Sequence, residues 1–574
     1  MPTKTVADLL VETLGAAGVE RIYGVSGDSL NGITDSIHAQ KQIEWIHMRH
    51  EEAAAFAAGA EAHLTGHLTV CAGSCGPGNL HLINGLYDCH RSRVPVLAIA
   101  AQIPSSEIGS SYFQETDPQH VFAQCSHYCE TVSHPEQMPR VLDIAIQTAI
   151  SRKGVAVVAI PGDIALRDAV ERRRLHFPPP RPTICPSEDE LTTLASLLNG
   201  AGRITILGGA GCAGAHSELI ALAATLKAPI VHALRGKEFI EYRNPYDVGM
   251  TGLLGFSSGY HAMMACDLLL MIGTDFPYQQ FFPKDATIVQ IDVRGEQLGR
   301  RTKVDYGFVG NAKATLQALL PRLNQQSDEK HLQAALAHYR TARSGLDDLA
   351  TNGDGQKPIH PQYVVRVLDE LASEDALFSC DVGTPTIWAA RYLSMNGKRR
   401  LLGSFNHGSM ANALPQAIGA QVSHPGRQVI SLSGDGGLAM MLGDLLSLRQ
   451  LNAPVKIVLF RNDALGFVEM EMKAAGIVDF GTDLKNPNFA ELAKAAGLLG
   501  LTAETPDQVR PMIAQALAHD GPALVEVLVS RQELSMPPTI TFEQAKGFGL
   551  FALKAVLSGR GDEIVDLAKV NLFR

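Results

Sequence analysis

The sequence predicts an α/β fold: three consecutive doubly wound parallel-sheet domains followed by an amphipathic C-terminal tail. Short apolar runs alternate with alanine-rich helical segments over three long stretches, which is the pattern of βαβ units around a buried parallel sheet. The length of 574 residues exceeds that of one ordinary domain. A hydrophobic content of 46%, with 19% charged residues, supplies several cores and excludes a disordered or fibrous chain.

The first domain is predicted to span residues 1–182. Within it, the alanine-rich segment Glu51–Ala62 favours a helix. The proline cluster Pro178–Pro182 interrupts the alternation and predicts a stiff linker. The predicted strands of this domain are Arg21–Val25, Thr69–Ala72, Val94–Ala100 and Val155–Ile160.

The second domain is predicted to span residues 183–335. Residues 209–214, after its first strand, fit the pattern Gly-x-Gly-x-x-Gly. No acidic residue stands near the end of the next strand to bind a ribose, so a tight helix entry is favoured over a dinucleotide fingerprint. The predicted strands are Arg203–Leu207, Pro229–Ala233, Asp267–Ile272 and Thr287–Asp292.

The third domain is predicted to span residues 336–530, with a loop-rich boundary at Thr351–Pro361. The proline pair Pro537 and Pro538 follows it, and residues 531–574 form the predicted tail. The predicted strands of the third domain are Ala376–Cys380, Gln428–Ser433, Lys456–Phe460 and Ala523–Val529.

Composition narrows the functional class. The net charge of −10 comes without a basic cluster, so nucleic-acid binding is not expected. The N-terminus carries no apolar signal segment and no run reaches the ~18 apolar residues of a membrane span, which predicts a soluble, cytoplasmic protein. Nine cysteines, an odd number, fit a reducing compartment. Cys125, His127 and Cys129 could suggest a metal site, but buried core residues are favoured because no second ligand pair follows.

The strongest chemical motif is Gly434-Asp435-Gly436, followed 27 positions after Asp435 by Asn462. Each part stands at the end of a predicted strand, where open α/β sheets gather ligand groups. Glycines let backbone amides approach a diphosphate, and the Asp435 carboxylate and Asn462 amide oxygen can ligate Mg²⁺. Gly-Asp-Gly alone also occurs in turns, but the distant Asn and the two strand contexts favour the functional interpretation.

This pattern resembles the thiamine diphosphate motif. The motif usually carries a second Asn before the ligating one, and Arg461 stands there instead, a departure that concerns local packing more than Mg²⁺ binding. Glu51 follows a predicted strand and begins a helix, where a carboxylate can simply complement the helix dipole. The resemblance instead implies that Glu51 hydrogen-bonds N1′ of the cofactor's aminopyrimidine.

The resemblance extends along the chain through Cys71–Asn79, Ser404–Met410 and Leu465–Phe467, which are similar to segments of pyruvate oxidases, and most of all to the quinone-dependent branch of that family. It implies oxidative decarboxylation of pyruvate to acetate and CO₂, with thiamine diphosphate, Mg²⁺ and FAD as cofactors. It also implies that electrons pass to membrane ubiquinone and that the protein is a homo-oligomer, with a tetramer suggested. The expected location is cytoplasmic, with peripheral attachment to the inner face of the cell membrane.

The resemblance assigns residues to each role. The catalytic and substrate-pocket residues are Glu51, Met410, Phe113, Gln114, Phe467 and Glu471. Thiamine diphosphate is assigned to Glu51, Gly408, Ser409, Met410, Asp435, Gly436, Gly437, Asn462, Ala464, Leu465, Gly466, Phe467 and Val468, with Asp435 and Asn462 as metal ligands. FAD is assigned to three loops of the middle domain: Thr251, Gly252, Leu253, Leu254 and Gly255; Asp275, Phe276, Pro277, Tyr278 and Gln279; and Asp292 with Val293.

The tail is predicted to contain an amphipathic helix. At about 100° per residue, its apolar side chains fall on one side and its charged side chains on the other. Such a helix could dock on its own domain, whereas the resemblance implies regulated lipid binding, and its acidic residues argue against simple attachment to anionic lipid. In the resting protein the apolar face is expected to lie against the catalytic domains, because an exposed stripe promotes aggregation. The apolar side comprises Ile564, Val565, Leu567, Ala568 and Leu572, and the polar side Asp562, Glu563, Asp566 and Lys569.

Three alternatives stay open at this point. An acetolactate-synthase-like carboligase would use the same cofactors with FAD redox-silent. An oxygen-dependent pyruvate oxidase would form acetyl phosphate, although the tail disfavours it. A non-catalytic lipid-binding protein is opposed by the joint presence of Glu51, Asp435, Asn462 and Met410.

Overall fold

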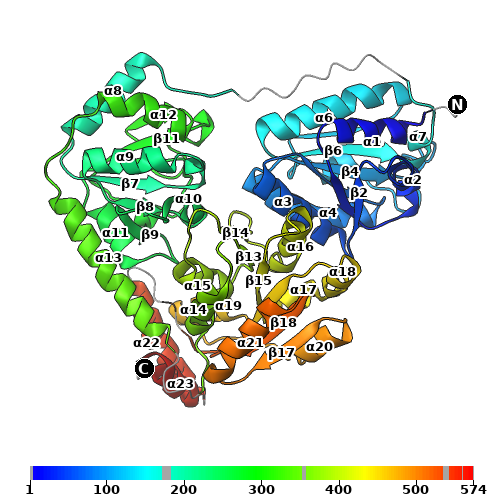
Figure 1. Ribbon diagram of the computed structural model, residues 1–574. Helices are drawn as coiled ribbons and strands as arrows, with labels where there is room; N and C mark the ends of the chain where they lie inside the picture. The colour runs from blue at the N-terminus through cyan, green and yellow to red at the C-terminus, as the bar shows by residue number, and fades with distance from the viewer. Residues whose placement is uncertain are drawn as a thin grey trace.

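The computed structural model describes residues 4–170, 182–351, 357–533, 535, 542–558 and 560–572. Within them it contains three six-stranded sheets in sequence, all of whose strand pairs are parallel, which confirms the predicted fold class. Figure 1 shows the three α/β units with the C-terminal helices beside the third. Residues 178–181 of the predicted proline linker, the pair Pro537 and Pro538, and residues 352–356 of the predicted 351–361 boundary lie outside the described residues.

The first sheet has the strand order β2-β1-β3-β4-β6-β5. The central strands are buried along their whole length, as apolar strands covered on both faces must be. Its strands are β1 (Arg21–Gly24), β2 (Glu44–His47), β3 (Thr69–Gly73), β4 (Val96–Gln102), β5 (Tyr128–Thr131) and β6 (Val155–Pro161). Its helices are α1 (Val6–Ala16), α2 (Asn31–Gln40), α3 (Glu51–Thr65), α4 (Pro77–Ser92), α5 (Pro118–Val121), α6 (Met138–Arg152) and α7 (Gly162–Ala165).

The middle sheet has the order β12-β11-β10-β7-β8-β9, the doubly wound order in which the sequence runs outward from the centre in both directions. Its strands are β7 (Ile204–Gly208), β8 (Ile230–His232), β9 (Asp247–Met250), β10 (Leu268–Ile272), β11 (Thr287–Asp292) and β12 (Tyr306–Val309). Its helices are α8 (Glu188–Gly200), α9 (His216–Leu226), α10 (Lys237–Ile240), α11 (Ser257–Met264) and α12 (Ala312–Leu319), followed by α13 (Lys330–Leu349).

The glycine pattern at residues 209–214 serves close packing of two loops. A Cβ on Gly209 would lie 2.6 Å from the Gly273 carbonyl oxygen, and a Cβ on Gly211 would lie 2.6 Å from the Gly273 Cα. The segment forms a 3₁₀ turn before α9 rather than the start of the helix itself. The predicted boundary at residues 335/336 falls inside α13, which packs against α11, so the exact domain limits stay predictions.

The third sheet repeats the strand order of the first, as β14-β13-β15-β16-β18-β17. Its strands are β13 (Leu377–Cys380), β14 (Arg400–Gly403), β15 (Val429–Gly434), β16 (Lys456–Arg461), β17 (Leu499–Ala503) and β18 (Ala523–Leu528). Its helices are α14 (Pro361–Leu371), α15 (Thr384–Tyr392), α16 (Ala413–Ser423), α17 (Asp435–Met440), α18 (Leu445–Gln450), α19 (Gly466–Ala474), α20 (Phe489–Ala495) and α21 (Pro506–Ala518).

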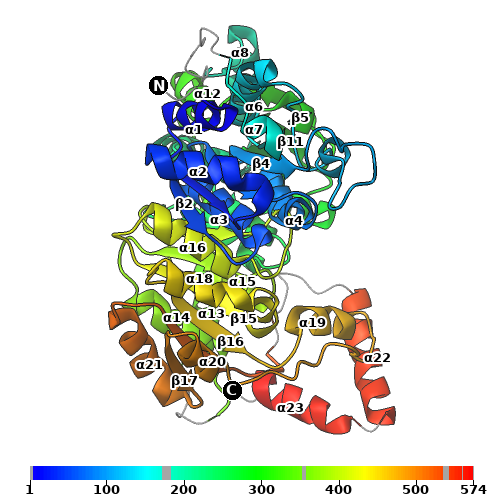
Figure 2. The same cartoon turned by 90° about the vertical axis from the view of Figure 1, so that its right-hand side faces the viewer.

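Helices α3 and α16 pack against each other between the first and third sheets (Figure 2). Buried side chains of both sheets and both helices form one continuous apolar core. The helices cross so closely that a Cβ on Gly419 would lie 2.1 Å from the Ala57 carbonyl oxygen, so glycine is required there. The first and third sheets are therefore held together within one chain.

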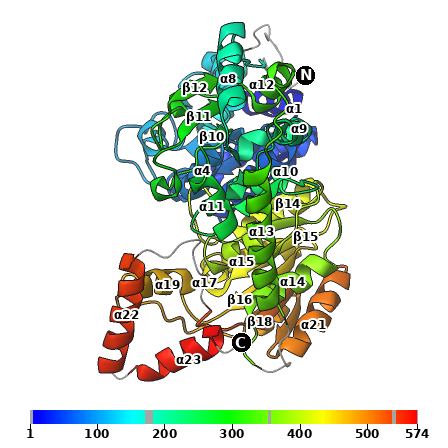
Figure 3. The same ribbon diagram turned by 90° about the vertical axis from the view of Figure 1, so that its left-hand side faces the viewer.

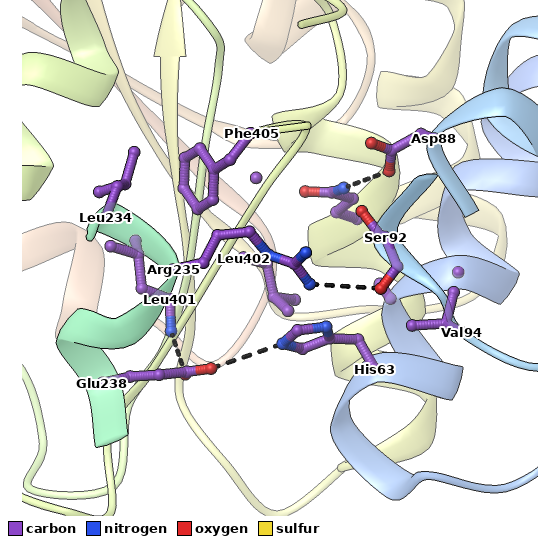
Figure 4. A pocket seen from close by; sticks show the side chains of 14 residues that line it. His63, Asp88, Ser92, Val94, Leu234, Arg235, Glu238, Leu401, Leu402 and Phe405 are labelled. Atoms are coloured by element: carbon purple, nitrogen blue, oxygen red, sulfur yellow. Dashed lines mark hydrogen bonds and ion pairs between the residues drawn. The ribbon is translucent and has the colours of Figure 1, made fainter. Parts of the chain in front are cut away.

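Charged side chains meet where all three domains touch (Figure 4). Glu238, from α10, accepts hydrogen bonds from the Arg400 Nε at 2.8 Å and the Leu401 amide at 3.1 Å. The His63 ring, from α3, lies 3.5 Å from the same carboxylate. Arg235 donates to the Ser92 carbonyl oxygen at 3.3 Å beside a cavity of about 30 Å³, enough for one water molecule. This polar junction fixes the middle domain against the other two.

The tail forms α22 (Phe542–Leu557) and α23 (Gly561–Leu572), and α22 packs against α19 (Figure 3). Phe551 and Ala555 are buried there, whereas Leu553, Val556 and Leu557 are exposed. On α23, Val565 is 51% exposed, so the prediction that its apolar face is fully covered is wrong at this position. The helix turns Val565 outward while Ile564 and Leu567 are half-buried, and the Leu572 side chain lies outside the described part.

The described residues show the state of the cysteines and the apolarity of the helices. All nine cysteines are free. Cys125 and Cys129 donate from Sγ to the carbonyl oxygens of Phe122 and Pro118, and Cys125 is buried in the core. Among the helices in the described ranges, none has the length and apolarity needed to cross a bilayer.

Candidate active site

Glu51 is the first residue of α3 and is nearly fully buried. His50 caps the helix, its Nδ1 accepting from the Glu52 amide at 3.2 Å. The Glu51 Oε2 lies 2.9 Å from the His81 Nδ1, and the His81 ring stacks on His50 with centroids 4.4 Å apart. Because an ionised carboxylate only accepts hydrogen bonds, His81 is the donor to Glu51.

The start of α4 and the loop before it border the Glu51 carboxylate. A Cβ on Gly78, the second residue of α4, would lie 3.0 Å from the Glu51 Oε1, so the helix and the carboxylate are in tight contact. The same loop contacts Gln114, whose Oε1 accepts from the Cys75 Sγ at 3.3 Å and whose φ is +63°. The structure therefore brings Gln114 to the loop that borders Glu51. Phe113, beside it, is 77% exposed.

Asn84 connects the start of α3 to the third domain. Its Nδ2 donates to the Glu52 Oε1 and to the Ser409 Oγ, both at 2.8 Å. Its Oδ1 lies 2.8 Å from the His407 Nε2. The loop that contains Gly408, Ser409 and Met410 is thus fixed against α4. Sequence reasoning missed Asn84 and His81, because only the fold places α4 beside the start of α3.

Asp435 and Asn462 meet at the carboxyl ends of the adjacent strands β15 and β16. The Asp435 Oδ2 accepts from the Asn462 amide at 3.2 Å and from the Asp463 amide at 2.7 Å. Burial raises the pKa of Asp435 against these backbone hydrogen bonds. An Asp carboxylate and an Asn side chain that follow adjacent strand ends offer the hard oxygen donors that suit Mg²⁺.

Gly436 and Gly437 follow Asp435 and lie in close contact with neighbouring side chains. A Cβ on Gly437 would lie 2.3 Å from the Asp381 Oδ2, and one on Gly436 would lie 3.3 Å from the Met410 Cε. Asp381 is buried, accepts from the Gly434 amide at 3.1 Å, and has its pKa raised to about 7 by burial. The structure therefore brings Met410 to the glycine loop, which fits a diphosphate cradle built from backbone amides.

The segment after Asn462 leads directly into α19. The Asn462 Oδ1 accepts from the Ala464 amide at 3.2 Å, and the Leu465 amide donates to the Thr482 carbonyl oxygen at 2.8 Å. Gly466 begins α19, and a Cβ there would lie 2.6 Å from the Asn462 Nδ2. On the helix, Phe467 is half-buried on the third core, and Val468 and Glu471 are exposed.

The three loops assigned to FAD follow β9, β10 and β11, so they lie at the same edge of the middle sheet. Gly252 has φ +97°, and a Cβ on it would lie 3.0 Å from the Phe276 ring, so the first two loops touch. Asp275 pairs with the Arg301 Nε at 2.9 Å. Val293 is exposed beside them.

Among the described residues, the Thr251 Oγ1 and the Arg294 Nη1 in these loops are buried polar atoms without a hydrogen-bond partner. Such atoms are destabilising unless a ligand or water satisfies them. Asp292 is buried and its pKa is raised to about 7 by burial, against the opposing effect of Arg93 from the end of α4. Unsatisfied donors of this kind beside a buried carboxylate fit a nucleotide cofactor such as FAD.

Tyr278 stands on the second loop assigned to FAD. Burial and the nearby Glu471 carboxylate of α19 raise the pKa of Tyr278. Within the described residues, His50, Glu51 and His81 are the one group whose ligand atoms lie close enough, within 4.8 Å, to hold a metal ion. The hydrogen bond between Glu51 and His81 accounts for that clustering without an ion.

Comparison with known proteins agrees with this geometry in all three domains. Residues 4–121, 191–319 and 381–527 match, respectively, the N-terminal TPP binding domain, the central domain and the C-terminal TPP binding domain of thiamine pyrophosphate enzymes. The chain belongs to the thiamine pyrophosphate enzyme family. Glu51 lies in the first matched segment, and Asp435 and Asn462 lie in the third.

Relatives within this family cover most of the chain. The putative thiamine pyrophosphate-containing protein YdaP of Bacillus subtilis is 36% identical over 572 residues, 99% of each chain. Pyruvate oxidase of Lactiplantibacillus plantarum is 32% identical over 533 residues, 91% of this chain and 88% of the relative. An uncharacterized 42.6 kDa protein of Pseudomonas amyloderamosa is 64% identical over 353 residues, 61% of this chain and 89% of the relative.

Proposed function

We propose that this protein oxidatively decarboxylates pyruvate and delivers the electrons through FAD to a membrane quinone such as ubiquinone. The reaction balances as pyruvate, water and quinone giving acetate, CO₂ and quinol. Similarity to pyruvate oxidase favours pyruvate, a 2-oxoacid, as substrate. The observation that carries the proposal is the presence of two buried atoms without a hydrogen-bond partner at the loops assigned to FAD, the Thr251 Oγ1 and the Arg294 Nη1, which a flavin nucleotide could satisfy.

Different residues are proposed to bind thiamine diphosphate and FAD. Thiamine diphosphate supplies the electron sink for loss of CO₂, and FAD supplies the two-electron acceptor. Asp435 and Asn462 would hold Mg²⁺ and with it the diphosphate, while Thr251, Asp292 and Arg294 would bind FAD. Glu51 would hold a proton at the aminopyrimidine through a charge-assisted hydrogen bond.

The substrate pocket is proposed to lie between the first domain and α19. Met410, packed on Gly436, would bend the cofactor, and Gln114, Phe467 and Glu471 would border the substrate. Phe113 is 77% exposed in the single chain. An aromatic ring that lines a substrate pocket is expected to be covered. The exposure of Phe113 therefore favours an oligomer in which a second copy completes the site, and a tetramer is the proposed assembly.

The tail is proposed to dock on the lipid surface at the inner face of the membrane. On α22, Leu553 and Leu557 are 58% and 77% exposed, and each could contribute roughly 1.5–3 kcal/mol on full burial in an interface. The helix is tied to the third domain by Lys554, whose Nζ donates to the Gly476 carbonyl oxygen at 2.8 Å. Arg560 pairs with Asp479 at 2.6 Å. Release of these contacts would free the helices to approach lipid.

A product assay tests the proposal. The purified protein is supplied with pyruvate, thiamine diphosphate, Mg²⁺ and a soluble quinone analogue, with and without phospholipid. We expect one acetate per quinone reduced, and faster turnover with lipid. Acetolactate with unreduced quinone would instead identify a carboligase, and acetyl phosphate formed only with oxygen and phosphate would identify an oxygen-dependent oxidase.

A further inference from the structure

Arg461 holds two carboxylates at the end of β16. Its Nε donates to the Asp463 Oδ1 at 2.8 Å, and its Nη1 donates to the Glu526 Oε1 at 2.8 Å. The Glu526 side chain is fully buried and also accepts from the Phe489 and Ala490 amides at 3.3 and 3.2 Å, at the start of α20. Glu526 therefore has other partners, whereas Asp463 is half-exposed beside the metal ligands.

Asp463 adds a second carboxylate to the metal loop. The Asn486 Nδ2 donates to the Asp435 Oδ2 and to the Asp463 Oδ1, each at 2.9 Å, so both carboxylates share one donor nitrogen. Asp463 has φ +55°, a left-handed conformation that Asp tolerates better than most residues. Its amide also donates to the Asp435 Oδ2. The loop thus places a second carboxylate beside Asp435, at the edge of the proposed diphosphate site.

We propose that Arg461 neutralises Asp463, so that this pair sets how strongly the site binds diphosphate relative to a divalent cation. The inference rests on the proposed diphosphate site. An unpaired Asp463 would repel the diphosphate and attract the cation, and an unpaired Arg461 would do the reverse. Arg461 is therefore a positioning and charge-balancing residue that accompanies Asp463, in place of the Asn that the family motif usually carries.

Opposite effects on diphosphate binding and on cation binding distinguish charge balance by Arg461 from a purely structural role. If Arg461 only supported α20 through Glu526, its loss would loosen the loop and weaken the binding of anion and cation alike. Charge balance instead predicts changes of opposite sign. The effects should also shrink as salt rises, because Asp463 is half-exposed and its charge is screened.

The test compares wild type, Asp463→Asn, Arg461→Gln and the double variant. Thiamine diphosphate binding is measured by calorimetry at saturating Mg²⁺, and Mn²⁺ binding without the cofactor is measured by electron paramagnetic resonance. We expect Arg461→Gln to weaken thiamine diphosphate about fivefold and tighten Mn²⁺ similarly, the scale of one partly screened charge. Asp463→Asn should do the opposite, and the double variant should return most of the way to wild type.

Asp463→Asn is the variant expected to keep the fold, because an amide oxygen can still accept from Arg461 and Asn486 at this half-exposed position. Thermal unfolding identifies any loss of fold in Arg461→Gln, and the Asp463→Asn result then decides alone. Changes of the same sign for both ligands, or none in Asp463→Asn, would overturn the inference. If wild type itself did not bind thiamine diphosphate, the proposed cofactor site would fail instead.

Discussion

The Glu51 Oε2 lies 2.9 Å from the Nδ1 of His81, so the buried carboxylate at the start of α3 is held by a side chain of α4. Gly78, one turn earlier on α4, leaves room for the second carboxylate oxygen. The carboxylate orientation is therefore fixed by contacts from a neighbouring helix before any cofactor binds. Such preorganisation is what a group needs in order to hold a proton at one defined atom.

Glu51→Gln should retain the fold and the flavin but lower pyruvate-dependent dye reduction by about 100-fold or more. The amide is nearly isosteric but cannot make the charge-assisted hydrogen bond to the aminopyrimidine. Glu52→Gln is the matched control, since it changes the adjacent carboxylate, which only accepts from Asn84 in the structure. Near wild-type activity in Glu51→Gln would remove Glu51 from the mechanism.

Asp435→Ala should weaken thiamine diphosphate binding while FAD stays bound. The carboxylate is a proposed Mg²⁺ ligand and also organises the loop amides of Asn462 and Asp463. Activity is titrated against cofactor concentration, and flavin content is read from its absorbance. Glu491→Ala, an exposed carboxylate on α20, is the control. An unchanged half-saturation point in Asp435→Ala would contradict the metal role.

Asp292→Asn should stabilise the flavin-free protein at pH 8 more than at pH 5. Burial raises the pKa of Asp292 to about 7, above the usual 3.8. Between these values the native state keeps a proton that the unfolded chain has released, so the free energy of unfolding falls as pH rises. Asn carries no such charge, which predicts a gain in the free energy of unfolding that is about 2.6 kcal/mol larger at pH 8 than at pH 5. Stability is measured by urea unfolding. An equal gain in the free energy of unfolding at pH 5 and at pH 8 would contradict the raised pKa of Asp292.

The double variant Leu553→Asp with Leu557→Asp should lose liposome binding while dye reduction stays unchanged. Both side chains are exposed on α22, away from the buried Phe551 that packs on the third domain. Leu166→Asp, at another exposed leucine, is the control. Flotation equal to wild type would exclude this face as the lipid contact.

Deleting residues 552–574 should leave dye reduction intact or raised and should lower electron delivery to membrane quinone. The deletion removes the Lys554 and Arg560 contacts to the segment after α19. Wild-type flotation is compared with and without pyruvate, because reduced enzyme must bind lipid more tightly for substrate to trigger docking. Equal flotation in both states would remove the switch.

Much of the fold was predictable because strong local signals coincide with buried parallel strands. The predicted strand Thr287–Asp292 is found as β11 with the same bounds, and Lys456–Phe460 is one residue short of β16. Short edge or near-edge strands such as β12 and β14 were not predicted. They carry four residues each and depend on pairing with a neighbour, which local sequence does not reveal.

The part of the site that could be predicted from the sequence is the part whose motif residues directly follow two adjacent strands. Asp435 and Asn462 meet because β15 and β16 pair in parallel, so their carboxyl ends lie at one edge. Asn486 was missed because it comes from a loop after α19, and its contacts to Asp435 and Asp463 arise only in the folded chain. Val565 was misplaced because a helical wheel describes the helix but not the surface against which it packs.

The central claim is that electrons from pyruvate reach the flavin, and anaerobic bleaching tests it most directly. The FAD-loaded protein, with thiamine diphosphate and Mg²⁺, is mixed with pyruvate without oxygen or quinone, and the flavin absorbance is followed. Glu51→Gln is mixed in parallel. The account predicts that wild type bleaches completely and that the variant does not. A wild-type flavin that stays oxidised while pyruvate is consumed would contradict the account and identify a carboligase.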